Sequence, residues 1–96
     1  MEDFIMFFHG DNTPGGGSDI GPYIEKLRKA GKFAGGSAMG GGACFRKKGR
    51  PGPLSSHIGG FIRVQARDLE EAEQLLEGNP IYESGGTVEI RWLPKT

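Results

Sequence analysis

The sequence predicts an α+β domain in which an antiparallel sheet carries two helices on one face. Short apolar segments typical of strands lie near both ends and in the middle of the chain. Two segments with the spacing of amphipathic helices separate them. Paired glycines punctuate the connections, and glycine is unusually frequent, at 18 of 96 residues. A chain of this length normally forms one domain, which we expect to span residues 1–96.

The first strand is predicted at residues 4–8, an uninterrupted apolar run that ends in a turn sequence at 9–12. A strand that is apolar on both sides is normally buried on both faces. We therefore expect something other than the helices to cover its second face. A second copy of the chain is the simplest cover, so a homodimer is predicted.

The first helix is predicted to begin between Ser18 and Pro22, with Ser18 or Asp19 as its cap. Gly31 suits the left-handed position that follows a helix. One apolar stripe has the spacing i, i+3, i+4 and i+7: Ile20, Tyr23, Ile24 and Leu27.

Two strands are predicted in the middle of the chain, at residues 33–39 and 58–66. Gly35 and Gly36 weaken the first of them. Between the two strands we expect a short strand at residues 43–47 and a loop at 49–53. Alternation in the later strand places one set of residues on a single face: Ile58, Gly60, Ile62, Val64 and Ala66.

The second helix is predicted to begin at Asp68, because Glu71 three residues later completes a capping box. Gly78 and Pro80 are expected to end it. Its apolar stripe consists of Leu69, Ala72, Leu75 and Leu76. After a turn at 84–86, a closing strand offers three core positions: Val88, Ile90 and Trp92. The order β-α-β-β-α-β is the ferredoxin-like arrangement, with the first and third main strands at the centre of the sheet.

Charge and composition exclude several classes of protein. Twelve basic and twelve acidic residues cancel, whereas nucleic-acid-binding domains carry a clear basic excess. The single cysteine, Cys44, leaves no internal disulfide and suits the cytoplasm. The longest apolar run is far below the ~20 residues of a membrane-spanning helix, and the first residues lack the positive charge of a signal peptide. The glycines at 40–42 lack the lysine of a phosphate-binding loop, and no cofactor is expected.

Three residues are candidates for acid–base catalysis. His57 precedes the third main strand, beside a loop that we expect to border a cleft. His9 and Asp11 end the first strand as His-x-Asp, in which the carboxylate would orient the imidazole. The structural alternatives are an ordinary loop histidine and an Asx turn at Asp11. The spacing of the three is not that of a metal motif, and no metal site is predicted.

Arg46 and Arg63 are the predicted ligand-binding residues. Arg46 lies in the only basic cluster, residues 46–50, which would attract phosphate or carboxylate or is simply solvated. Arg63, like Glu89 and Arg91, lies on a strand face opposite the helix-facing positions, where it would line a cavity or form an interface ion pair. Cys44 is read as a small, half-buried residue rather than a nucleophile.

Several motifs resemble the YCII-related, or DGPF-domain, family. They are the glycine pair 59–60 with the following phenylalanine, the helix start at 68–72, the segment 79–91, and the segments 10–11 and 30–36. The resemblance implies a dimeric α/β barrel in which two ferredoxin-like subunits pack sheet against sheet. In that family a histidine–aspartate pair has been proposed as catalytic, with its histidine in the first helix. This sequence has no histidine between residues 18 and 31, and its signature reads Pro-Gly-Pro-Leu at 51–54.

Two functions stay open at the level of sequence. One is a small-molecule-binding dimer, with or without His/Asp acid–base chemistry, whose pocket lies between the sheet and the helices. The other is a non-catalytic regulatory or accessory dimer. The two differ in whether His57 and Asp11 converge on a concavity.

Overall fold

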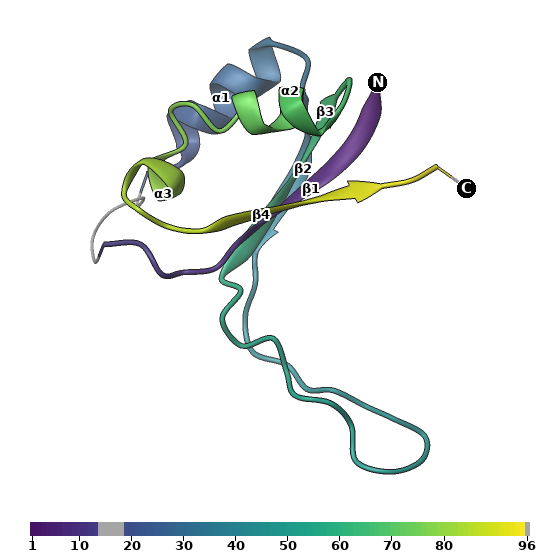
Figure 1. Cartoon of the computed structure of the whole chain (residues 1–96). Coiled ribbons are helices and arrows are strands. Elements are labelled where there is room, and N and C mark those ends of the chain that lie inside the picture. Colours follow the sequence, from purple (N-terminus) through teal and green to yellow (C-terminus); the bar gives the residue numbers. More distant parts are fainter. Residues whose placement is uncertain (14–18, 96) are drawn as a thin grey trace.

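The computed structural model describes residues 1–13 and 19–95 and contains four strands and three helices in those ranges (Figure 1). The strands form one antiparallel sheet in the order β2-β3-β1-β4, and the helices lie on one side of it. This confirms the predicted ferredoxin-like α+β fold. The elements are β1 (Glu2–Phe8), α1 (Gly21–Lys29), β2 (Phe33–Ala38), β3 (Gly60–Ala66), α2 (Leu69–Gln74), α3 (Pro80–Glu83) and β4 (Val88–Leu93).

β1 is hydrogen-bonded on both sides, to β3 and to β4. Phe4, Met6 and Phe8 alternate along it, are at most 6% exposed and face the helices. Ile5 and Phe7 point to the other side of the sheet, which no helix covers and which we call the open face. The rest of the core comes from the helices and β3: Tyr23, Leu27, Ile62, Val64, Ala66, Ala72 and Leu76.

α1 begins at Gly21, within the predicted range of residues 18–22, but its N-cap position is one residue after Asp19, the later of the two predicted caps. Ile20 is the N-cap, and the Asp19 carboxylate accepts a hydrogen bond from the Gly21 backbone N–H at 3.1 Å. Ser18, the other predicted cap, lies outside the described residues. The Tyr23 hydroxyl of α1 donates to the backbone oxygen of Leu75 at 2.6 Å and so joins the two helices. Burial raises the pKa of this phenol.

Asp68 and Glu71 stabilise the start of α2 as predicted, but Glu71 makes different hydrogen bonds from those of a capping box. Asp68 caps the helix by accepting from the Glu71 backbone N–H at 2.9 Å. The Glu71 carboxylate reaches back to the Arg67 N–H rather than to that of Asp68, and it also binds the side chains of Arg67 (2.6 Å) and Lys32 (3.2 Å). These hydrogen bonds, the Arg67 side chain first, lower the pKa of Glu71 to about 2. They tie the first turn of α2 to the residue that precedes β2.

Some sequence predictions in this region are wrong. α2 ends at Gln74, and Pro80 opens a separate short helix, α3, in which the Asn79 side chain accepts from the N–H groups of Ile81 and Tyr82. Trp92, on the edge strand β4, is 57% exposed rather than part of the core, and its indole N–H donates to Glu2 at 3.1 Å. Val88 and Ile90 pack against the core as predicted.

The segment between β2 and β3 is also not as predicted. Residues 39–59, which we call the arm, contain no strand, so the expected strand at 43–47 is absent and β3 begins at Gly60. The arm extends away from the sheet (Figure 1), where no neighbouring strand is available to pair with it. A hydrogen bond from the Met39 N–H to the Gly59 oxygen, at 3.0 Å, closes its base. Cys44 is exposed rather than half-buried.

Within the described residues, no helix has the length and apolar character needed to cross a membrane.

We expect Glu71→Gln to lower the melting temperature by several degrees at pH 7, because the neutral amide loses the ionic hydrogen bonds to Arg67 and Lys32. The folded pKa lies below the ordinary 4.5, so this stabilisation is complete above about pH 4.5 and disappears as the pH falls towards about 2. Melting curves from pH 2 to pH 7 should therefore converge at acid pH. Glu73→Gln, at an exposed site in the same helix, is the control and should have no such profile.

Candidate functional site

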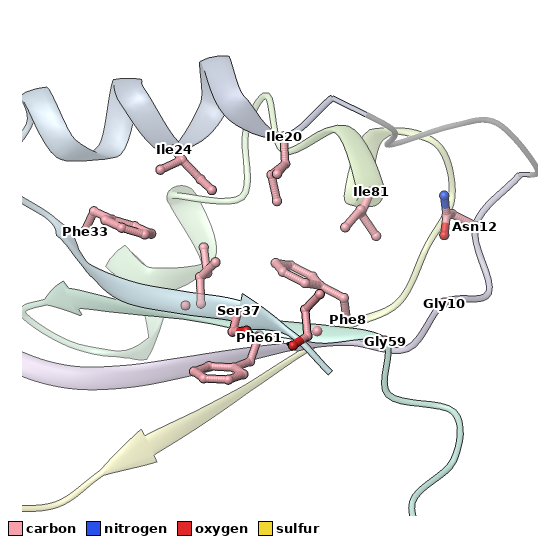
Figure 2. Close-up of a pocket in the computed structure, with 14 residues that line it drawn as sticks. Phe8, Gly10, Asn12, Ile20, Ile24, Phe33, Ser37, Gly59, Phe61 and Ile81 are labelled. Atoms are coloured by element: carbon pink, nitrogen blue, oxygen red, sulfur yellow. Dashed lines mark hydrogen bonds between the residues drawn. The ribbon is translucent and has the colours of Figure 1, made fainter. Parts of the chain in front are cut away.

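An apolar pocket of about 340 Å³ lies between the helices and the sheet, at the end of the sheet where β1 finishes (Figure 2). α1 contributes Ile24, with Ile20 just before it, and Ile81 of α3 closes one side. The remaining lining residues come from the strands and their ends: Phe8, Gly10, Asn12, Phe33, Gly36, Ser37, Ala38, Gly59, Gly60, Phe61 and Ile62.

The chemistry of this pocket is almost wholly apolar. Among the described residues, the polar side chains in its lining are those of Asn12 and Ser37, and no lining residue carries an ionisable side chain. The Ser37 hydroxyl donates to the backbone oxygen of Ala38 at 2.8 Å. Glycine is required at one wall, since a Cβ on Gly36 would lie 2.5 Å from the backbone oxygen of Phe61. The pocket can therefore enclose an apolar molecule but cannot itself transfer a proton.

A second group of side chains lies on the open face, at the same end of the sheet. His9 Nε2 is 2.8 Å from Glu89 Oε1, and the other oxygen of Glu89 accepts from Arg91 at 3.3 Å. The ring of His57 stands edge-on to that of His9, with 4.7 Å between centroids and 82° between planes. The hydrogen bonds from His9 and then Arg91 lower the pKa of Glu89, which favours its charged form. A carboxylate thus orients His9, as a catalytic histidine requires.

The carboxylate that orients His9 is Glu89, whereas the sequence predicted Asp11. Asp11 accepts from the backbone N–H and the hydroxyl of Thr87, both at 2.7 Å, and these bonds lower its pKa. It therefore joins the end of β1 to the start of β4. Glu89 was recognisable as an open-face residue from the alternation in β4, but the pairing of β1 with β4 brings it opposite Phe7 and so beside His9.

The structure places the histidines and the pocket on different sides of the sheet. Phe8 faces the pocket, so the next residue, His9, points towards the open face with Glu89. Gly10 and Gly59, which line the end of the pocket, lie between the two groups, and a Cβ on Gly10 would be 3.5 Å from the His57 backbone oxygen. His57 and Asp11 accordingly do not converge on this concavity.

The two predicted ligand-binding arginines are also apart from the pocket. Arg46 is exposed in the arm, where it donates to the backbone oxygen of Arg50 at 3.4 Å. Arg63 is exposed on the open face of β3, opposite Ile5 of β1. Among residues 1–13 and 19–95, no group of three or more His, Cys, Asp or Glu side chains is arranged to hold a metal ion.

The positions of Asp11 and His57 predict different effects on the melting temperature when each is replaced by alanine. Asp11→Ala should lower the melting temperature by several degrees, because the Thr87 N–H and hydroxyl lose their acceptor. His57→Ala, at an exposed site, should leave it nearly unchanged. Thermal unfolding of both variants checks this; an unchanged melting temperature for Asp11→Ala would contradict the structural role.

Comparison with known proteins gives a family and a structural neighbour. A search of curated proteins finds no significant match. Among solved structures, the 5-chloro-2-hydroxyhydroquinone dehydrochlorinase of Burkholderia phenoliruptrix, in complex with 2,5-dihydroxybenzoquinone, superposes with a TM-score of 0.60 and 17% identity, over 98% of this chain and 95% of that one. The YCII-related domain matches residues 16–93. The chain therefore belongs to the YCII-related family.

Proposed function

We propose that this protein binds a small, flat, largely apolar organic molecule in the pocket beneath α1. The observation that carries the proposal is the lining: apolar side chains and glycine backbone, with Asn12 and Ser37 as the polar side chains. Its volume of about 340 Å³ lies at the small end of the ~300–1,000 Å³ of typical ligand pockets. A charged ligand would be disfavoured there, since no ionisable side chain of the lining would balance its charge.

The structural neighbour supports the size and the single-ring shape of this ligand. The dehydrochlorinase was solved with 2,5-dihydroxybenzoquinone, a single ring with oxygen substituents. A ring of that kind fits the apolar walls formed by Phe8, Phe33 and Ile24, and its oxygens would face Asn12 or Ser37. We therefore expect substituted phenols and quinones to be better ligands than sugars or amino acids.

The catalytic form of this proposal assigns proton transfer to His57, with His9 behind it and Glu89 as the orienting carboxylate. Imidazole exchanges protons near neutral pH and is the commonest general acid–base group in enzymes. The pocket lining contains no titrating side chain, so a proton donor or acceptor has to come from beyond its end at Gly10 and Gly59. His9 and His57 are the histidines adjoining that end.

The pocket proposal is tested with a variant whose larger side chain occupies the pocket. In a thermal-shift screen of phenols and quinones, a ligand at 100 times its dissociation constant should stabilise wild type by about 2.7 kcal/mol. Ala38→Phe should remove the shift, because Ala38 lines the pocket from the edge strand β2. Ala34→Phe adds the same side chain to the same strand at an exposed position outside the lining, and it should keep the shift.

His57→Ala separates binding from catalysis when turnover of a ligand from the screen is assayed beside its thermal shift. Binding alone predicts an unchanged shift in this variant, whereas the catalytic form predicts an unchanged shift together with loss of turnover. A ligand shift that survives Ala38→Phe would show that the molecule binds elsewhere and would refute the pocket.

The alternative, a non-catalytic regulatory or accessory dimer, is favoured by the open face. Ile5, Phe7 and Phe61 are only half-buried there, and the central strand that carries two of them has no helix over this side. The charged residues Arg63 and Glu89 border them. Apolar side chains with a charged border are typical of a surface that a second subunit covers, and a homodimer through this face is part of both functions.

Phe7→Lys should disrupt association through the open face and leave the fold intact, because each subunit would bring a charged side chain into an apolar interface. Multi-angle light scattering at micromolar concentration measures the mass. Trp92→Lys replaces an exposed apolar residue, 57% exposed on β4, whose register opposite Phe4 places it on the helix side of the sheet, and it should leave the dimer intact. A monomeric wild type at that concentration would refute the open-face dimer.

A further inference from the structure

Residues 40–56 of the arm line neither the pocket nor the histidine group on the open face, yet the arm dominates the shape of the molecule (Figure 1). The radius of gyration is 14.6 Å, against about 12.5 Å for a compact chain of this length. Phe45, within the arm, is 91% exposed. Met39 and Leu54 of the same arm are also exposed, at 42% and 45%, and exposed apolar side chains gathered in one segment are typical of a surface that another molecule covers.

Charge is strongly divided along the sequence. Residues 26–67 contain no aspartate or glutamate, and residues 68–90 contain no lysine or arginine. The arm carries four cations: Arg46, Lys47, Lys48 and Arg50. Within the described residues, none of these four side chains forms an ion pair. The net charge of the whole chain is zero, but the arm is cationic and residues 68–90 are anionic.

The anionic half presents an unpartnered helix face. The outer side of α2 and α3 is hollowed by about 460 Å³, and Leu76 and Tyr82 form apolar parts of the hollow. Tyr82 is 47% exposed. The carboxylates around it make no ion pair or hydrogen bond with the described residues: Glu70, Glu73, Glu77 and Glu83. This face thus matches the arm in both respects, with the exposed Tyr82 ring beside the largely buried Leu76 for an apolar contact and acids for the cations.

The arm does not reach this face of its own chain. It enters β3 at Gly60, whereas α2 follows the other end of β3, after Ala66. A strand of that length separates the two attachment points by roughly 20 Å, and the arm extends further away (Figure 1).

We propose that the arm of one copy of this chain docks on the outer face of α2 and α3 of a second copy. Phe45 packs against Tyr82 and Leu76, and the arm cations lie opposite the glutamates of the partner copy. Each chain carries both halves of the contact, so two arms can be exchanged reciprocally and both charge patches are neutralised. A foreign polyanion would match the arm alone and would be repelled by the glutamate face.

The position of the chain's single cysteine makes the contact directly testable. Cys44, exposed beside Phe45, is labelled with a maleimide that carries a photo-cross-linker. Equal amounts of normal and ¹⁵N-labelled protein are mixed and irradiated, and the cross-linked peptides are mapped by mass spectrometry. Cross-links between chains are expected at residues 69–83. They should decline as the salt concentration rises.

Charge reversal tests the partner surface specifically. Lys47→Glu/Lys48→Glu/Arg50→Glu and Glu70→Lys/Glu73→Lys/Glu77→Lys change exposed side chains only, and circular dichroism checks that both variants fold. Each variant alone should lose the interchain cross-link by roughly tenfold, and mixing the two should restore it, because the reversed arm then meets a reversed face. The proposal is overturned if cross-links stay within one chain, map to the open face, or survive charge reversal. It is equally overturned if the arm binds RNA or anionic vesicles while no interchain cross-link forms.

Discussion

The fold depends on one constraint, the burial of β1 between two neighbouring strands. Because both edges of β1 are paired, its alternating side chains are the only part of it left to interact. Phe4, Met6 and Phe8 supply the core surface on which α1 and α2 pack. Ile5 and Phe7 give the opposite surface the apolar character that calls for a second layer. The core, the pocket beside Phe8 and the open face all follow from this strand.

The same alternation separates binding from acid–base chemistry. A pocket made by Phe8 and its neighbours is apolar because it is a continuation of the core, closed imperfectly where Gly36 and Gly60 remove side chains. His9 directly follows Phe8 at the end of β1 and hence points to the other side of the sheet, where Glu89 of β4 and His57 of the arm lie beside it. If two subunits pack open face to open face, this polar group lies near the subunit boundary, whereas the pocket belongs to one chain.

The proposed contact would supply ion-pair partners that the arm and the outer face of α2 and α3 do not have among the described residues of one chain. A loop of this length has no core of its own, its phenylalanine is exposed, and its cations form no ion pair among the described residues. The glutamates on the outer face of α2 and α3 likewise form no ion pair with the described residues. Weak surface ion pairs contribute little singly, but several of them around one buried ring give direction and specificity to an association.

The sequence by itself determined the strands at both ends and in the middle, the two main helices, the cap at Asp68 and the membership of the family, because these depend on local periodicity and short motifs. It also identified His9 and His57 as candidate site residues. The tertiary structure decided that Glu89 rather than Asp11 orients His9, that Trp92 is exposed, and that the segment at 43–47 is not a strand. Those outcomes depend on which strands pair and at which register, a property of segments some eighty residues apart that no local pattern encodes.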